Sequence, residues 1–335
     1  MIRMLYLSRD GQVTFELSPS KLWNALQDRE GLLWVDFEGE PPETCEPILR
    51  NTFGFHPLAV DDALQESHVP RIDDWGTYLY LVLPAVIFRA GGESLIETLE
   101  LDAFLGPNYL VSHHDHPVAA VDKVWQACQR DPRHLQHKVD HVLYKIVDEL
   151  AASYMAVVES MDDDIDLIED EVFEKPTSAT LERIFKMKRA LIQLRRVLMP
   201  QREVLNKLAR GDYTVIDAED RVFFRDVYDH LVRMHDITES MRDLVGGALD
   251  TYLSVINNRM NDIMKTLTLI TTLFMPLSFL TGFFGMNFFQ PVANLDSWTD
   301  ILAFVITLIV IMATPAAMYF WMRRQGWSRG WEKKR

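Results

Sequence analysis

Polar and small side chains recur in steps of four and three near the C-terminal end of this chain of 335 residues. Positions on such a heptad seam normally carry Leu, Ile or Val when helices pack in water. Here the line carries small or polar residues and Met, whereas Leu, Ile and Phe lie off it, with Leu267 beside it. The seam consists of Asp250, Ser254, Asn257, Asn261, Met264, Thr268, Thr271, Met275, Ser278, Gly282 and Gly285.

Two interpretations of this seam are open. Small residues let helix backbones approach closely in a membrane, and Ser or Thr form weak hydrogen bonds there, which is typical of a packing face. Alternatively, copies of the helix around an axis would enclose a water-lined pore. Asp250, Asn257 and Asn261 favour the pore, because polar side chains in a tight contact need partners. A pore also requires several copies of the chain, since the pattern predicts only two membrane helices.

Those two helices are predicted from long runs without charge. Residues 266–295 and 301–322 contain no Asp, Glu, Lys, Arg or His, and about twenty helical residues span a bilayer. We therefore expect membrane helices at 266–288 and 301–322, joined by a loop at 289–300. The tail at 323–335 carries six basic residues and one acid. Segments rich in Lys and Arg next to a membrane helix usually stay on the cytoplasmic side. The pattern therefore predicts a multi-pass protein of the plasma or inner membrane with both termini in the cytoplasm.

The charge balance excludes some partners. The net charge is −15, which would repel nucleic acid and attract divalent cations; solubility alone is the other explanation. Cys45 and Cys128 stand apart without a metal-binding spacing, which indicates a reducing compartment. No nucleophile–base pair or phosphate loop stands out, so we do not expect an enzyme.

The part before the membrane divides into two regions. Residues 1–135 alternate β-branched or aromatic runs with short helical stretches at 20–28, 43–52 and 57–65, and this predicts an α/β domain. Residues 136–265 predict a helical region and stalk. It would contain helices at 139–174 and 181–209, and then one of more than 60 residues that starts near Ala218 and enters the membrane.

These motifs together resemble one family. The tripeptide Gly285-Met286-Asn287, ending the first of two C-terminal membrane helices after a long helix, resembles the CorA family of magnesium channels. The segments "HPLAVDDALQESHVPRIDDW" and "MDDDIDLIEDEVFE" are also similar to that family. The resemblance implies a funnel-shaped homopentamer with a cytoplasmic α/β domain, a helical stalk and a two-helix transmembrane hairpin. It implies Mg²⁺ influx, with Co²⁺ and Ni²⁺ as further candidate ions.

The resemblance also implies functional residues. Gly285, Met286 and Asn287 would form a selectivity filter, where neutral oxygens hold hydrated Mg²⁺ through its waters. Without the resemblance, Gly and Asn there would suit an ordinary helix C-cap. Cytoplasmic Mg²⁺ would bind between subunits and hold the pore closed. The matching positions for that site are Asp61, Asp62, Asp148, Asp226 and His230.

Some features depart from the family pattern or leave alternatives. The outer loop lacks the acidic motif that often follows the tripeptide, and Asp296 is its nearest acid. A zinc-transporting branch has Val where this chain has Met286, which favours magnesium; zinc transport and a non-conducting, membrane-anchored metal sensor remain alternatives. His113, His114 and His116 are predicted in a loop, and a zinc site there is not favoured because no second ligand cluster is close in sequence.

Overall fold

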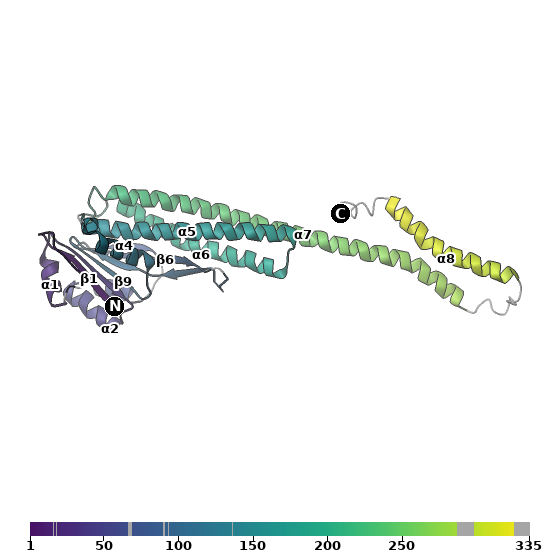
Figure 1. Ribbon diagram of the computed structural model, residues 1–335, viewed down its shortest axis with the longest axis horizontal. Helices are drawn as coiled ribbons and strands as arrows, with labels where there is room; N and C mark the ends of the chain where they lie inside the picture. Colours follow the sequence, from purple (N-terminus) through teal and green to yellow (C-terminus); the bar gives the residue numbers. More distant parts are fainter. Residues whose placement is uncertain are drawn as a thin grey trace. The chain divides into compact units, whose positions relative to one another are not determined.

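The computed structural model describes residues 1–15, 17, 19–65, 69–89, 91–92, 94–135, 137–286 and 298–324. The chain divides into two compact units, Met1–Tyr252 and Leu253–Arg335. The first contains the sheet and three long helical segments. The second contains the end of the long helix and the described part of one further helix (Figure 1).

The first unit is built on a mixed sheet with strand order β2-β1-β3-β9-β8-β5-β4. Only the β3–β9 pair is parallel; the other neighbours in this sheet are antiparallel. A separate hairpin pairs β6 with β7. The strands are β1 Ile2–Leu7, β2 Val13–Phe15, β3 Leu32–Glu38, β4 Arg71–Asp74, β5 Leu79–Val82, β6 Ala85–Phe88, β7 Ile96–Leu99, β8 Asp102–Leu105 and β9 Tyr109–His114.

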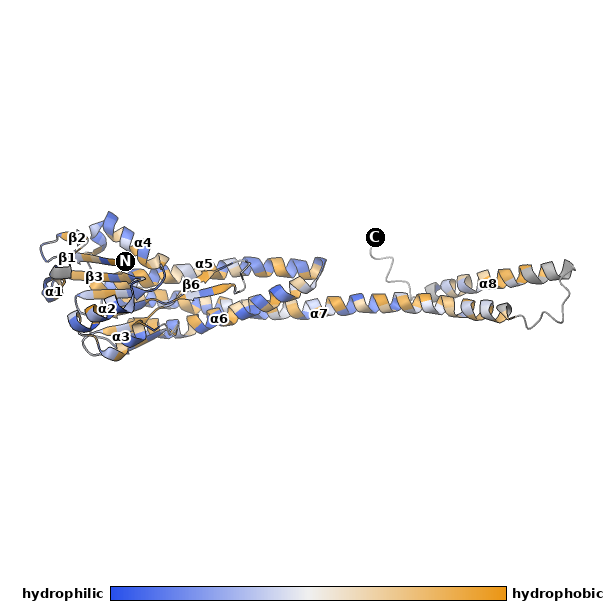
Figure 2. Ribbon diagram, turned by 90° about the horizontal axis from the view of Figure 1, so that it is seen from below, coloured by the Kyte–Doolittle hydropathy of each residue, from blue (hydrophilic) through white to orange (hydrophobic). Residues whose placement is uncertain are grey.

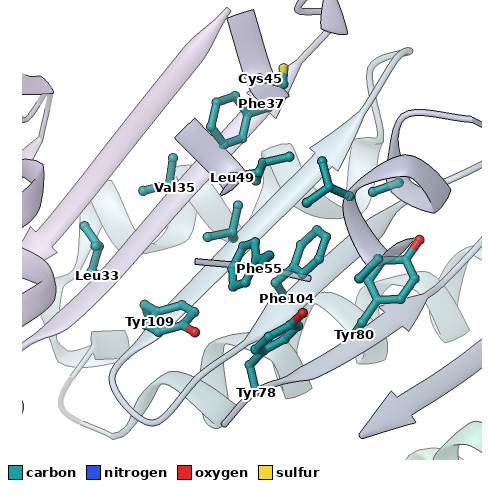
Figure 3. Packing of buried hydrophobic residues seen from close by; sticks show 14 of the residues in the cluster. Leu33, Val35, Phe37, Cys45, Leu49, Phe55, Tyr78, Tyr80, Phe104 and Tyr109 are labelled. Carbon is teal, nitrogen blue, oxygen red and sulfur yellow. The ribbon is translucent and has the colours of Figure 1, made fainter. Parts of the chain in front are cut away.

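Helices cover both faces of this sheet. Side chains of the strands alternate between faces, and one face packs an aromatic core in which the rings of Phe55 and Phe104 stack with centroids 4.2 Å apart (Figure 3). That face is covered by α1 Pro19–Gln27, α2 Pro42–Pro47, η1 Ile48–Thr52 and α3 Pro57–Ala63. On the other face, Trp34 meets Trp125 of α4, Ala119–Arg130, edge to face at 4.9 Å.

The helical part follows. The short helix η2 (Pro132–Leu135) leads into α5 (Val139–Glu174), which packs on β6 and β9. Then α6 (Ser178–Arg210) starts at an N-cap, where Thr177 and Thr180 exchange side-chain-to-backbone hydrogen bonds, and ends at Gly211 in the left-handed conformation that glycine favours. The last helices are α7 (Arg221–Gly285) and α8 (Trp298–Arg324).

The structure corrects several sequence predictions. The helix α4 was not predicted. The prediction of a loop is wrong for His113 and His114, because both belong to β9 and are buried. The predictions of a helix at 139–174 and of one longer than 60 residues are confirmed, since α7 has 65 residues.

Candidate cation pathway and regulatory metal sites

The polar seam occupies an uncovered line of α7. The predicted pore-lining residues from Asp250 to Ser278 are all exposed in the single chain, including Asn257, Asn261, Thr268 and Thr271. The larger members are no exception: the exposed fractions are 58% for Met264, 60% for Leu267 and 66% for Met275. Nothing in the described part of this chain covers the seam, so water or another molecule must meet it.

Off the seam, the same stretch of α7 carries large apolar side chains. Some of them, Leu269, Leu273 and Leu280, are half-buried. Others, such as Ile263, Ile270 and Phe279, are exposed, so the residue types and not the exposure distinguish the seam. The sequence of α8 is mostly apolar, with Thr307 and Thr314 inside it, and the coloured part of the helix in Figure 2 ranges from orange to pale. The polar line is therefore a property of one face of α7 and not of the whole C-terminal part.

Two threonines show what the seam offers chemically. The hydroxyl of Thr268 donates to the backbone carbonyl of Met264 at 2.8 Å, and that of Thr271 donates to Leu267 at 2.9 Å. A hydroxyl has one hydrogen and two lone pairs. Because the hydrogen is already used within the helix, each oxygen is left as an acceptor on the exposed face. Acceptors of this kind suit the water molecules around a hydrated cation, which can only donate.

The end of α7 carries the predicted filter. The helix ends at Gly285, and the backbone N–H of Met286 still donates to the carbonyl of Gly282 at 3.2 Å. The Met286 side chain is exposed. Asn287 lies outside the described residues. The structure thus describes the helix that leads to the predicted filter, together with two of its three residues.

Among the described residues, one helix, Arg221–Phe283, is long and apolar enough to cross a bilayer, and a shorter apolar stretch occupies Val305–Trp321. The apolar window of the long helix is not buried inside the chain. A core helix of a soluble protein would be largely covered, so this exposure distinguishes α7 from one.

Three of the five predicted regulatory residues lie together where α5 and α7 pack. The Asp226 carboxylate lies 3.9 Å from Nε2 of His230. The half-buried Asp148 on α5 faces both: burial raises its pKa, the charges of Glu149 and Asp226 raise it further, and His230 lowers it. Concentrating negative charge in this way favours binding of a cation or a proton.

The other two predicted residues lie elsewhere, on α3, and are paired with arginines. Asp61 accepts a hydrogen bond from Arg50 at 2.6 Å, and Asp62 is 2.8 Å from Arg71. In the portion of the chain that the structure describes, no three His, Cys, Asp or Glu side chains are arranged to hold a metal ion. A complete site built from these residues would therefore need groups from a second copy or a rearrangement.

A buried polar network inside the sheet was not predicted from the sequence. Asp36 is fully buried, accepts hydrogen bonds from Arg3 at 2.6 Å and from the hydroxyl of Ser112, and lies 3.2 Å from Nε2 of His114. Burial alone would raise the pKa of Asp36, but His114, Ser112 and Arg3 outweigh it and lower that pKa. The only signal in the sequence was an acid within the apolar run "LLWVDFE".

A second buried acid lies on the opposite face. Asp102 accepts a hydrogen bond from the hydroxyl of Tyr80 at 2.6 Å, and its other oxygen is 3.9 Å from Nδ1 of His113. Burial raises the pKa of Asp102 to about 7, although the neighbouring His113 and Tyr80 oppose the shift. These groups occupy the sheet and not the helices, so they bear on stability rather than on the seam.

Comparison with known proteins agrees with this geometry. Residues 29–324 match the family described as CorA-like Mg²⁺ transporter protein. The chain is 33% identical over 295 residues to YfjQ of Bacillus subtilis, covering 88% of this chain and 89% of that protein. It is 32% identical over 289 residues to the cobalt/magnesium transport protein CorA of Thermotoga maritima, covering 86% and 81%.

A solved structure supports the same fold. The complete structure of the CorA magnesium transporter from Methanocaldococcus jannaschii superimposes with a TM-score of 0.81 at 23% identity and covers 98% of both chains. The structural match and the sequence matches both extend over most of the chain, including the sheet and the long helix α7. The chain belongs to the family of CorA-like Mg²⁺ transporter proteins.

Proposed function

We propose that this protein is a divalent-cation channel that lets Mg²⁺ enter the cytoplasm, with Co²⁺ and Ni²⁺ as further candidate ions. The observation that supports it most is the exposed seam of α7, whose polar face has no cover within the chain. Polar groups in a membrane helix need water or partners. A ring of seams around a common axis supplies both a water-filled path and oxygen acceptors for the hydrated ion.

The proposed assembly is a funnel-shaped homopentamer in the inner or plasma membrane. Residues 1–135 form the α/β domain and 136–265 the helical region and stalk, all in the cytoplasm. Residues 266–288 line the pore, 289–300 form the outer loop, 301–322 form the second membrane helix and 323–335 the basic cytoplasmic tail. The charge-free runs and the basic tail support this orientation.

In this proposal Gly285, Met286 and Asn287 form the selectivity filter. Mg²⁺ loses its waters reluctantly, so neutral carbonyl oxygens that hold the hydrated ion suit conduction better than carboxylates, which would bind more tightly and release more slowly. Met286 supports magnesium over zinc, because the zinc-transporting branch carries Val at this position.

We further propose that cytoplasmic Mg²⁺ closes the pore by binding between copies. Asp148, Asp226 and His230 of one copy would face Asp61 and Asp62 of the next, and the ion would relieve the repulsion among these carboxylates. Asp226→Lys places a fixed positive charge in the site, so flux should lose its dependence on internal Mg²⁺. A variant that still assembles and keeps that dependence would locate the sensor elsewhere.

The decisive experiment is Mg²⁺ flux into liposomes that contain the purified protein. The unsubstituted chain should conduct, whereas Asn287→Ala should abolish uptake and leave the oligomer intact by light scattering. Competition by Co²⁺, Ni²⁺ and Zn²⁺ in the same assay then ranks the ions. Normal uptake by Asn287→Ala would remove the filter assignment, and no flux of any divalent cation would favour a non-conducting metal sensor.

A further inference from the structure

An apolar line runs along the outer side of α6. Phe185, Ile192 and Met199 are 44%, 41% and 40% exposed, and each is seven residues from the next. Single exposed apolar residues are common on protein surfaces and need no explanation. Three at a strict interval of seven form one stripe, and such a repeat is the pattern by which a helix meets another helix.

This stripe borders a hollow and carries positive charge on both sides. A hollow of about 590 Å³ is lined by residues of α6 that include Leu181, Phe185 and Ile192. The exposed side chains of Lys188, Arg189 and Arg196 flank the stripe, and none of them belongs to an ion pair of the described residues. The partner that fits this face is a helix with an apolar line flanked by acids. We call this face the basic stripe.

A second exposed face in the same unit combines an apolar line with acids along one side, and the exposed Arg233 also lies on it. On α7, Ile237 and Leu244 are 39% and 45% exposed and seven residues apart. Beside them, Asp229, Asp236 and Asp243 repeat at the same interval and are also exposed. Two of these acids have exposed ion pairs on α7, Asp243 with Arg242 at 3.0 Å and Asp229 with Arg225 at 3.8 Å, and both contribute little because the groups are solvated. We call this face the acidic stripe.

The two stripes lie at the same height along the helices. Arg195 of α6 bonds Glu239 of α7 at 3.1 Å within the chain, and this fixes the relative level of the two neighbouring helices (Figure 1). Because they run in opposite directions at about 1.5 Å per residue, Ile237 is level with about position 197 and Leu244 with about position 190. Ile237 therefore falls between Ile192 and Met199, and Leu244 falls between Phe185 and Ile192, as interdigitating side chains require.

We propose that the basic stripe of α6 in one copy docks on the acidic stripe of α7 in a second copy of this chain. Rotation about an axis parallel to the helices keeps every residue at its own height, so stripes that are level within one chain stay level between copies. The contact joins two different surfaces, and head-to-tail contacts of this kind close into rings. The inference rests on the proposed ring assembly and names the surface that would build its cytoplasmic part.

Disulfide formation in the full-length protein tests this contact. In a background with Cys45→Ala and Cys128→Ala, we would co-express a tagged Ile192→Cys chain with an untagged Leu244→Cys chain. Their heights differ by about 3 Å, so a mixed disulfide between chains of different size is expected on mild oxidation. The control pair, Phe185→Cys with Ile237→Cys, differs in height by about 18 Å, beyond the 4.4–6.8 Å between Cα atoms that a disulfide allows, and should remain uncoupled.

Charge reversal gives a second test that needs no cysteine. Arg189→Glu with Arg196→Glu should weaken assembly, and so should Asp236→Arg with Asp243→Arg, while combining all four changes should restore it. Light scattering measures the oligomer independently of transport. An intact oligomer without the Ile192–Leu244 disulfide overturns this surface but leaves the ring. If the unsubstituted protein forms no oligomer by light scattering, the proposed ring itself is overturned. Self-coupling of the Ile192→Cys chain alone would show a symmetric contact and also overturn the proposal.

Discussion

The polar groups of the sheet and those of the α7 seam differ in whether the chain itself supplies their hydrogen-bond partners. In the sheet, Asp36 has no exposed surface, accepts hydrogen bonds from Arg3 and Ser112 of the same chain, and has the His114 ring 3.2 Å away. On α7, Asn257 and Asn261 are exposed and have no hydrogen-bond partner among the described side chains. A buried polar group without a partner costs free energy. Where the chain supplies the partner, the group serves the fold; where it does not, the partner must come from outside.

This difference separates stability from transport, and each can be tested on its own. The largest effect on stability is expected for Asp36→Ala. The substitution removes the buried acceptor that Arg3 and His114 share, while Arg3 keeps Asp122 at 2.6 Å. Breaking a buried ion pair from one side costs about 3–5 kcal/mol, which is the upper limit here. Denaturant unfolding of the purified protein measures it.

The matched control is Asp163→Ala, which removes an exposed acid of α5. Its free energy of unfolding should stay within about 0.5 kcal/mol of the unsubstituted protein. Similar losses for the two variants would mean that the buried network contributes no more than a solvated charge.

The next largest effect on stability is expected for a substitution of Asp102, and this effect depends on pH. The pKa of its carboxyl rises from 3.8 to about 7 on folding. Between those values the unfolded chain has released the proton and the native chain still holds it, so this group costs stability as pH rises from about 4 to about 7, and the cost stays constant above. Asp102→Asn keeps an acceptor for Tyr80 and removes the titration.

The variant should therefore gain stability relative to the unsubstituted protein across that window, by an upper limit of roughly 4 kcal/mol at pH 8. Parallel unfolding series at several pH values measure the difference. Asp166→Asn, which changes an exposed acid, should show no such trend. A constant difference between the Asp102 variant and the unsubstituted protein at all pH values would contradict the burial argument.

Long helices were predictable from the sequence because their signals are local and repeated. The absence of Pro and Gly and the helical spacing of apolar residues gave α5 its boundaries, and α7 was found as a single helix despite Gly246 and Gly247. By contrast, α4 was missed. Its first residues follow a strand closely. It also contains the β-branched or aromatic residues Val121, Val124 and Trp125, which are typical of strands when read without their spacing.

The candidate sites were predictable only in part, for a related reason. The seam follows a period along one helix, so its exposure could be anticipated. The arginine partners of Asp61 and Asp62 could not, because Arg50 and Arg71 come from other elements. The sequence did not place His113 and His114 in a strand, because the following Asp115 and Pro117 indicated a loop. The loop in fact begins only after His114, where β9 ends.

Met264 tests the seam side of the comparison. Its replacement should hardly change stability but should change transport. Its side chain is 58% exposed in the chain, so replacing it removes no internal packing and should alter the free energy of unfolding by no more than about 0.5 kcal/mol. In the proposed pore, however, a ring of such side chains forms an apolar constriction. A ring of this kind can stop ions by dewetting without physically blocking the path.

Met264→Asn would let water stay in that ring, so flux at high internal Mg²⁺, where the unsubstituted channel is closed, should rise. Met264→Ala should act in the same direction by widening the ring. The control is Ile263→Asn, which makes a similar change at a side chain 62% exposed but about 100° around the helix. Equal flux for the Met264 and Ile263 variants would identify the seam as a packing face, and the polar line of α7 would then need a partner other than water.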